Sequence, residues 1–199
     1  QAMGVDVVDA GITTTPTVAM GVTHLQANGG IMISASHNPR NWNALKLMDD
    51  RGEFLTAAQA ERLYEIAANP ASMNGATVDR LGRYEQDEGL LEMHISRILE
   101  LPLIDVEAIR NAGFTVVVDG VNSSGGIAIP MLLEHLGVKK VVEVFCEPNG
   151  VFPHNPEPLP EHLGELSSEV VARNAHLGLA VDPDVDRLAI VCEDGEVFG

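Results

Sequence analysis

The sequence predicts an α/β protein with two domains, each a mixed or parallel sheet flanked by helices. Short apolar runs alternate with helical patterns of about ten residues, which is typical of βαβ units. Hydrophobic residues make up 45% of the 199 residues, enough to bury a substantial core. A polar stretch without periodicity runs from Pro70 to Gly89, and we place a domain junction near its end. The predicted domains are residues 1–88 and 89–199.

The first half of the chain contains three predicted strands. Val5–Asp9 is the first, and Thr15 and Pro16 then begin a helix, since a cap followed by proline is typical of helix N-termini. Gly30–Ser34 is the second strand, and Ala44–Met48 follows a polar loop as the third.

Two further helices are predicted on either side of the junction. Thr56 and Gln59 form a capping box in front of the alanine-rich helix Ala57–Ala68, which Asn69 and Pro70 end. Beyond the junction, the spacing of six residues predicts a helix: Leu90, Leu91, His94, Ile95, Ile98 and Leu99.

The second half alternates regularly between helices and strands. The predicted elements are helix Val106–Ala112 ended by Gly113, strand Thr115–Asp119, helix Gly126–Leu136 ended by Gly137, strand Lys140–Phe145, helix His162–Asn174 and strand Leu177–Val181. This order favours parallel strands with right-handed crossovers. A hairpin follows, from Leu188–Cys192 through Asp194 and Gly195 to Glu196–Phe198. Because this last arm has no continuation to cover it, we expect a longer parent chain.

Composition excludes several classes of protein. The formal net charge of −17 offers no basic stripe for a phosphate backbone, so we expect no nucleic acid partner. No apolar run reaches the roughly 18 residues that span a bilayer, so we expect no membrane partner. Cys146 and Cys192 each lie in an apolar run and are predicted to be core residues of a protein from a reducing, cytoplasmic compartment.

The first loop that could carry catalytic residues is Ser34-Ala35-Ser36-His37-Asn38-Pro39, at the end of a predicted strand. A serine there can present its hydroxyl above the sheet edge, with His37 and Asn38 as polar partners and Pro39 fixing the turn. An ordinary Ser and Asn turn explains this loop equally well when it is taken alone.

The second loop is Asp182-Pro183-Asp184-Val185-Asp186-Arg187, directly after an apolar strand. Three carboxylates at alternate positions repel one another unless a hard cation such as Mg²⁺ or Ca²⁺ lies between them. The Arg187 guanidinium adds a fork suited to a phosphoryl group. A solvated acidic turn without metal remains the alternative.

An EF-hand is a poor interpretation of this loop. Asp182, Asp184, Asp186 and Glu193 do fall at calcium-loop positions 1, 3, 5 and 12. However, Arg187 occupies the sixth position, which requires glycine, and the residues that follow form an apolar β-type run instead of ligands and a helix.

Together the two loops resemble those of the α-D-phosphohexomutase family, which includes phosphoglucomutases, phosphomannomutases and phosphoglucosamine mutases. That family has a Ser-His-Asn-Pro active-site loop and an Asp-x-Asp-x-Asp-Arg metal loop. The segments Trp42-Asn43-Ala44-Leu45-Lys46 and His154-Asn155-Pro156-Glu157-Pro158 add to the match. The resemblance covers the later part of the family's first domain and its second domain, and it implies a phosphoglucomutase-like fold.

The resemblance implies an intramolecular phosphotransferase that interconverts hexose 1-phosphate and hexose 6-phosphate. Ser36 would carry a phosphoryl group and give it to the sugar, forming a bisphosphate intermediate that reorients and returns its other phosphoryl group. Mg²⁺ would be held by Asp182, Asp184, Asp186 and an oxygen of the phosphoserine at Ser36.

Three further residues receive roles from the same resemblance. Arg187 would touch the transferred phosphate, and His37 and Lys46 are candidates for moving the proton of the sugar hydroxyl. From the residues alone, a solvated histidine and an outward-pointing lysine are the favoured interpretations. Arg40 is expected at the surface, and His154 with Asn155 is expected to have a structural role.

The resemblance also implies missing partners. The family's opening segment, the sugar-reading loop of its third domain and the phosphate-binding loop of its fourth domain have no counterpart here. We therefore expect the partners to be a phosphorylated hexose, its bisphosphate intermediate, and domains 3 and 4 of the same chain. Alone, the fragment should turn over little substrate, and the sugar stays unidentified.

Two other functions compete with this one. The first is a metal-stabilised binding or regulatory module without transfer chemistry. The second is a phosphatase of the haloacid-dehalogenase type, whose nucleophile would need an Asp-x-Asp context that Asp119, followed by Gly120 and Val121, does not provide.

Overall fold

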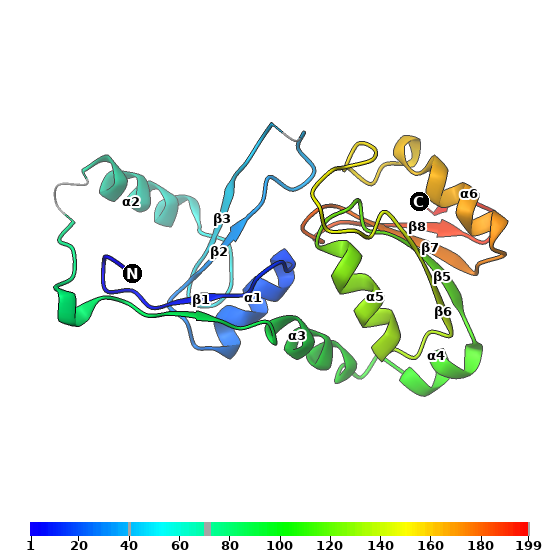
Figure 1. Ribbon diagram of the computed structural model, residues 1–199, viewed down its shortest axis with the longest axis horizontal. Helices are drawn as coiled ribbons and strands as arrows, with labels where there is room; N and C mark the ends of the chain where they lie inside the picture. The colour runs from blue at the N-terminus through cyan, green and yellow to red at the C-terminus, as the bar shows by residue number, and fades with distance from the viewer. Residues whose placement is uncertain (40, 70–72, 199) are drawn as a thin grey trace.

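A computed structural model describes residues 1–39, 41–69 and 73–198, whose strands form one five-stranded sheet and two two-stranded sheets. The small sheets belong to the first part of the molecule (residues 1–86) and the large sheet to the second part (residues 106–198). The two parts lie side by side along the long axis (Figure 1). Arg40, expected at the surface, and Pro70, expected to end a helix, lie outside the described residues.

The sheet of the second part has the strand order β6-β5-β7-β8-β9. Its strands are β5 (Thr115–Asp119), β6 (Lys140–Val144), β7 (Leu177–Val181), β8 (Leu188–Cys192) and β9 (Val197–Phe198). β5 pairs in parallel with β6 and β7, which confirms the predicted parallel strands. β8 pairs antiparallel with both β7 and β9, which confirms the terminal hairpin.

Helices cover both faces of this sheet. The covering helices are α5 (Gly125–His135) and α6 (Gly164–Ala172), and this part also contains α4 (Val106–Ala112) and the 3₁₀ turn η3 (Pro160–His162). Val117 of β5, an inner strand of the sheet, belongs to a core cluster with Leu166 of α6, whereas Val116 and Val118 belong to a second cluster with Leu133 of α5. Alternate residues of β5 therefore enter two cores, as expected for a parallel strand covered on both sides.

Two predicted helices differ from the structure. The helix predicted over Gly126–Leu136 is shifted by one residue, since α5 begins at Gly125 and ends at His135. The helix predicted over His162–Asn174 is divided, because Leu163 adopts φ −101° and ψ 16° and separates η3 from α6. The other predicted bounds in this part agree within a residue, the usual uncertainty at element ends.

The first part contains two separate strand pairs. Its elements are β1 (Val7–Asp9), α1 (Thr15–His24), β2 (Gly30–Ile33), β3 (Leu45–Met48), α2 (Ala57–Ala68), the 3₁₀ turn η2 (Val78–Arg80) and β4 (Tyr84–Gln86), and α3 (Leu90–Leu99) follows. β2 pairs antiparallel with β3, and β1 pairs in parallel with β4. β4 is absent from the sequence-based prediction because its three residues are all exposed and show no apolar alternation.

Side chains cap both helices of the first part. The capping box of Thr56 and Gln59 is present at the start of α2, as predicted. At α1 the capping residue is Thr14, whose hydroxyl accepts from the Thr17 N–H, so the predicted start at Thr15 is one residue late for the cap. The Thr17 hydroxyl also lies 2.9 Å from His94 Nδ1, which links α1 to α3.

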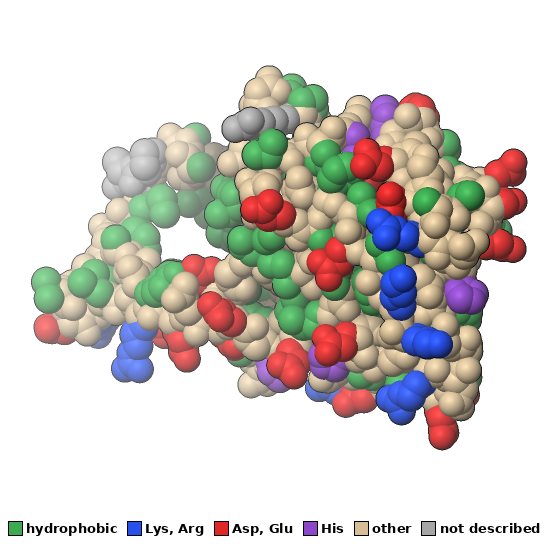
Figure 2. Space-filling model, turned by 45° about the vertical axis from the view of Figure 1, so that its right-hand side comes forward, with side chains coloured by type: hydrophobic (Ala, Val, Ile, Leu, Met, Phe, Trp, Pro, Cys, Tyr) green, Lys and Arg blue, Asp and Glu red, His purple; other side chains and the backbone are tan. Residues whose placement is uncertain are grey.

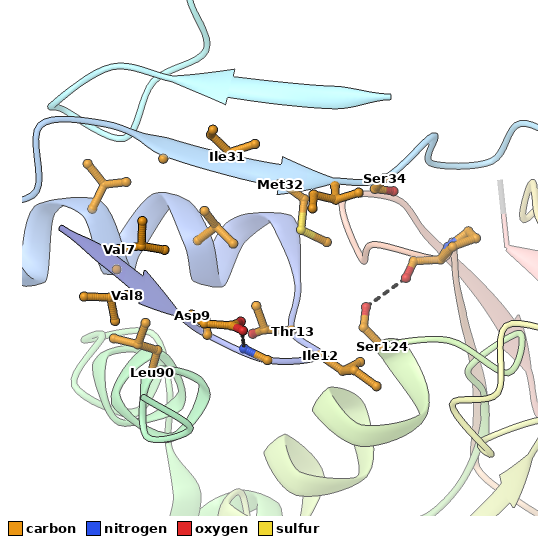
Figure 3. A pocket seen from close by; sticks show the side chains of 18 of the residues that line it. Val7, Val8, Asp9, Ile12, Thr13, Ile31, Met32, Ser34, Leu90 and Ser124 are labelled. Carbon is orange, nitrogen blue, oxygen red and sulfur yellow. Dashed lines mark hydrogen bonds between the residues drawn. The ribbon is translucent and has the colours of Figure 1, made fainter. Parts of the chain in front are cut away.

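A cavity of about 890 Å³ separates β1 from β2. Figure 3 shows that Val7 and Val8 of β1, Ile31 of β2 and Leu90 line it. Ile31 is 59% exposed, a large fraction for an apolar side chain in a strand. The hydrophobic core of the first part is therefore open to solvent, whereas the core of the second part is closed.

The surface is acidic overall. Asp and Glu side chains are spread over the face seen in Figure 2, interspersed with Lys and Arg. Cys146 and Cys192 are both free and half-buried, and burial raises the pKa of the Cys146 thiol to about 11. Among the described residues, no helix is long and apolar enough to cross a membrane.

Candidate active site

The serine loop and the acidic loop meet between the two parts of the molecule. Ser36 follows β2 and Asp182 follows β7, yet the Ser36 hydroxyl donates to Asp182 Oδ2 at 2.5 Å. These residues are 146 positions apart in the chain. The two loops predicted separately from the sequence thus form one site.

Both loops contain a residue with left-handed backbone geometry. Ser36 has φ +52° and Val185 has φ +62°, a region that non-glycine residues seldom occupy. The Ser36 N–H donates to Ser34 Oγ at 2.8 Å, which holds the turn that presents the Ser36 hydroxyl. Such backbone conformations cluster at functional sites because the surrounding structure must stabilise them.

Asp182 organises its own loop. Its Oδ1 accepts from the backbone N–H groups of Asp186 and Arg187, each at 3.0 Å, and Oδ2 accepts from Ser36. Burial, reinforced by the neighbouring charge of Asp184, raises the pKa of Asp182 above its usual range.

Three carboxylates and one ammonium group form the centre of the site. Ligand oxygens of Asp182, Asp184 and Asp186 lie within 4.8 Å of one another. Lys46 Nζ, from β3, is 2.6 Å from Asp184 Oδ2 and 2.5 Å from Asp186 Oδ2. Although burial opposes it, the hydrogen bonds to these carboxylates raise the pKa of Lys46.

These residues fit a hard divalent cation. Asp182 and Asp184 are at most 1% exposed, and Asp184 Oδ1 is buried without a hydrogen-bond partner among the described residues. Leaving a carboxylate oxygen in that state is costly unless a cation binds it. The donors are all oxygens, which Mg²⁺ and Ca²⁺ prefer, and the ammonium of Lys46 is already drawn to the same charges.

The N-terminus of α1 also contacts the acidic loop, which the sequence did not indicate. Thr15 Oγ1 donates to Asp184 Oδ2 at 2.6 Å, and the Thr15 N–H donates to Asp184 O at 2.9 Å. Burial alone would raise the pKa of Asp184, but the hydrogen bonds from Lys46 and Thr15 lower it below its usual value. The threonines before Pro16 were the only local signal, and they indicated just a helix start.

Two serines at the start of α5 donate hydrogen bonds to the backbone of the acidic loop. Ser123 Oγ and Ser124 Oγ each donate to Pro183 O at 2.8 Å. A Cβ at Gly126 would lie 2.4 Å from Cys146 O, so glycine is needed for this close approach of helix to strand end.

The remaining predicted residues lie around the serine. His37 Nδ1 is 3.3 Å from Ser36 Oγ, and Arg187 Nη1 donates to Glu157 Oε1 at 2.8 Å. The same oxygen of Glu157 is 3.9 Å from His37 Nε2. All seven predicted site residues are therefore in one place, and Glu157 joins them from a segment that was expected to be structural.

The comparisons with known proteins identify the family of this chain. Residues 1–73 match the model of the phosphoglucomutase/phosphomannomutase α/β/α domain I, and residues 92–195 match that of domain II. The chain belongs to the phosphoglucomutase/phosphomannomutase family. This confirms the resemblance to α-D-phosphohexomutases that the two loops indicate.

Relatives within the family are more than twice as long as this chain. It is 36% identical over 193 residues to the phosphoglucomutase/phosphomannomutase of Thermococcus kodakarensis, covering 96% of this chain and 41% of the relative. It is also 36% identical over 196 residues to the phosphoglucosamine mutase of Sulfurovum sp. strain NBC37-1, covering 98% of this chain and 43% of the relative.

Solved structures of the family have the same fold. A phosphoglucomutase/phosphomannomutase family protein from Burkholderia thailandensis has a TM-score of 0.79 and 30% identity, covering 98% of this chain and 42% of that one. The pp63/parafusin phosphoglucomutase of Paramecium has a TM-score of 0.74 and covers 96% of this chain and 41% of that one. At 16% identity, the second likeness concerns the fold alone.

Proposed function

We propose that this chain is part of a phosphohexomutase that interconverts hexose 1-phosphate and hexose 6-phosphate through a phosphoserine at Ser36 and a bisphosphorylated sugar. The observation that carries the proposal is the 2.5 Å contact between Ser36 Oγ and Asp182 Oδ2. It places a nucleophilic hydroxyl on a cluster of three carboxylates, of which Asp182 and Asp184 are buried, and this is the combination that metal-assisted phosphoryl transfer requires.

Asp182, Asp184 and Asp186, with an oxygen of the phosphorylated Ser36, would hold Mg²⁺. When bound, this cation neutralises charge on the phosphoryl group in transfer. Until then, Lys46 balances the charge of Asp184 and Asp186.

The chain's own residues would work as follows. The phosphorus–oxygen bond to Ser36 breaks as a sugar hydroxyl attacks the phosphoryl group. The His37 imidazole would accept the hydroxyl proton, and the Lys46 ammonium, which lies between two carboxylates, would donate a proton to the departing Ser36 oxygen. After the bisphosphate reorients, its other phosphoryl group returns to Ser36 Oγ and a proton returns to the sugar oxygen. Arg187 would contact the transferred group, because its backbone N–H already bonds to Asp182 beside the serine.

The partners in this proposal are a phosphorylated hexose, its bisphosphate intermediate and domains 3 and 4 of the full-length chain. The proposed domain boundary lies between residues 88 and 89, just before α3 begins at Leu90. Two free cysteines are consistent with a reducing cytoplasmic compartment.

The test is mutase activity of the full-length parent chain against a panel of hexose 1-phosphates, with Mg²⁺ and a bisphosphate primer. Interconversion that collapses in Ser36→Ala would support the proposal and identify the sugar. If no sugar is converted, and Mg²⁺ raises thermal stability equally in both proteins, the alternative of a metal-stabilised binding module would take its place.

A further inference from the structure

The segment from His154 to Glu157 is anchored by a contact between the half-buried His154 and the buried Asp119. His154 Nε2 is 2.8 Å from Oδ2 of Asp119, and Asp119 is 1% exposed at the end of β5. His154 Nδ1 lies 2.8 Å from Asn155 O, and the ring stacks edge-on against Phe145 at 5.7 Å between centroids. The base of this loop is therefore fixed to the end of β5, an inner strand of the sheet.

The backbone of Glu157 is held on both sides. Its N–H donates to Asn155 Oδ1 at 3.0 Å, and its carbonyl accepts from the Leu159 N–H at 2.8 Å. Pro156, the residue before it, is buried. The Glu157 carboxylate thus extends from a constrained turn.

One oxygen of this carboxylate reaches both active-site loops. Glu157 Oε1 accepts from Arg187 Nη1 at 2.8 Å and lies 3.9 Å from His37 Nε2. On its other side, the His37 ring lies 3.3 Å from Ser36 Oγ. Glu157 therefore stands between a cation of the acidic loop and an imidazole of the serine loop.

Stability alone does not explain this arrangement. The side chains of Glu157 and Arg187 are 30% and 44% exposed, and ion pairs this exposed contribute little to folding. A carboxylate beside a phosphate site also repels the substrate. That repulsion is tolerable if the carboxylate fixes the groups that bind the phosphate.

We propose that Glu157 is a positioning residue, which holds the Arg187 guanidinium and orients the His37 imidazole at the serine loop. This inference rests on the proposed function. Glu157 acts through these two groups and does not itself touch the reacting atoms.

The kinetic test compares Glu157→Gln and Glu157→Asp in the full-length parent chain, with Glu161→Gln as the matched control. Glu161 is an exposed glutamate of η3, four residues further along the chain. We expect Glu157→Gln to lower kcat by about tenfold or more with little change in KM, since misplacing a group costs transition-state stabilisation. Glu157→Asp should recover part of the loss, and Glu161→Gln should match the wild type.

A double-mutant cycle shows whether the effect passes through Arg187. If it does, adding Glu157→Gln to Arg187→Gln should lower kcat by less than about twofold further, because coupled residues are not additive. Full additivity of the two losses would overturn the proposal.

Phenylglyoxal labelling of Arg187, followed by mass spectrometry, gives a readout that does not need turnover. Labelling should be several-fold faster in Glu157→Gln than in the wild type or Glu161→Gln. A parent chain without mutase activity but with this labelling change would defeat the proposed function and retain the positioning role. An active parent in which Glu157→Gln matches Glu161→Gln in both kcat and labelling would defeat the inference.

Discussion

Asp184 is 1% exposed, and its two oxygens have different surroundings. Oδ2 accepts from Thr15 and contacts Lys46, whereas Oδ1 has no hydrogen-bond partner among the described residues. A carboxylate held in this way is prepared to bind a cation through its free oxygen.

Asp184→Asn should therefore weaken Mg²⁺ binding to the full-length chain, measured by isothermal titration calorimetry. We expect a loss of at least about tenfold, since even changes in the outer shell of a metal site have that effect. Glu193→Gln is the control, because Glu193 would be a ligand only in an EF-hand. Unchanged affinity in Asp184→Asn, or a loss in Glu193→Gln, would contradict this assignment of the ligands.

The pair of His154 and Asp119 predicts a pH-dependent stability. The hydrogen bond to Asp119 raises the pKa of His154 above its ordinary value of 6.5. A raised pKa in the folded state means that the pair stabilises the protein fully below pH 6.5 and that this contribution is lost as pH rises through the folded pKa.

Urea unfolding of the wild type and His154→Gln at pH 6 and pH 9 measures this effect. At pH 6 the variant should be less stable by about 2 kcal/mol, typical of a hydrogen bond to a charged group. The difference in the free energy of unfolding between the wild type and His154→Gln should be smaller at pH 9. A difference that stays the same at both pH values would show that His154 contributes by packing alone.

Sequence reasoning found the site residues that form local patterns. Asp182, Asp184 and Asp186 repeat at alternate positions, and a repeated charge in a tight loop requires an explanation wherever the chain folds. Thr15 and Glu157 have no such pattern, since their functional contacts are with residues 169 and 30 positions away. Only the folded structure brings these partners together.

At the scale of elements, the predictions succeeded where local chemistry decides the structure. β5 and β7 were predicted with their observed bounds because they are continuous apolar runs buried on both faces. β4 was missed because its pairing with β1, some 77 positions away in the chain, gives three exposed residues a strand conformation. Short edge strands of this kind have no signal of their own.

The helix α2 is suited to measuring how much a capping box contributes to the stability of a helix. None of its residues is buried, and it lies at the end of the molecule remote from the five-stranded sheet (Figure 1). Its capping box should therefore supply much of its stability.

Thr56→Ala should destabilise α2 by about 1 kcal/mol, the usual cost of losing a cap. Hydrogen exchange followed by mass spectrometry should then show α2 amides exchanging about fivefold faster. Amides of β5 should exchange at the wild-type rate, because this helix opens without the second part. Equal acceleration in both regions would mean that α2 is coupled to the global fold.

At the scale of the whole molecule, the site lies between two parts whose hydrophobic cores are packed to different degrees. The second part has a closed core on both faces of its sheet, whereas the first has a cavity of about 890 Å³ between β1 and β2. Contacts of Ser36, Lys46 and Thr15 with the acidic loop join the two parts. Composition and periodicity predicted two α/β domains but not their contact, which depends on pairs far apart in the chain. Only the family resemblance implied it, by placing Ser36 and the three aspartates around one cation.

This arrangement predicts which properties the 199-residue chain keeps when it is separated from the rest of its parent. The acidic cluster and Ser36 are both present, so Mg²⁺ affinity should be close to that of the full-length protein. The chain spans only 41 to 43% of the relatives described above, so groups that orient a sugar phosphate would come from elsewhere.

Positioning supplies several kcal/mol of barrier reduction, so we expect kcat/KM of the isolated chain to be at least about 1,000-fold below that of the parent. Assays at equal protein concentration, with Mg²⁺ affinity measured in parallel, separate loss of orientation from loss of folding. Low turnover with normal Mg²⁺ binding is the expected result. Turnover comparable to the parent would mean that these two parts alone position the sugar, and Trp42, which is 62% exposed beside the serine loop, would then be the first side chain to test for sugar contact.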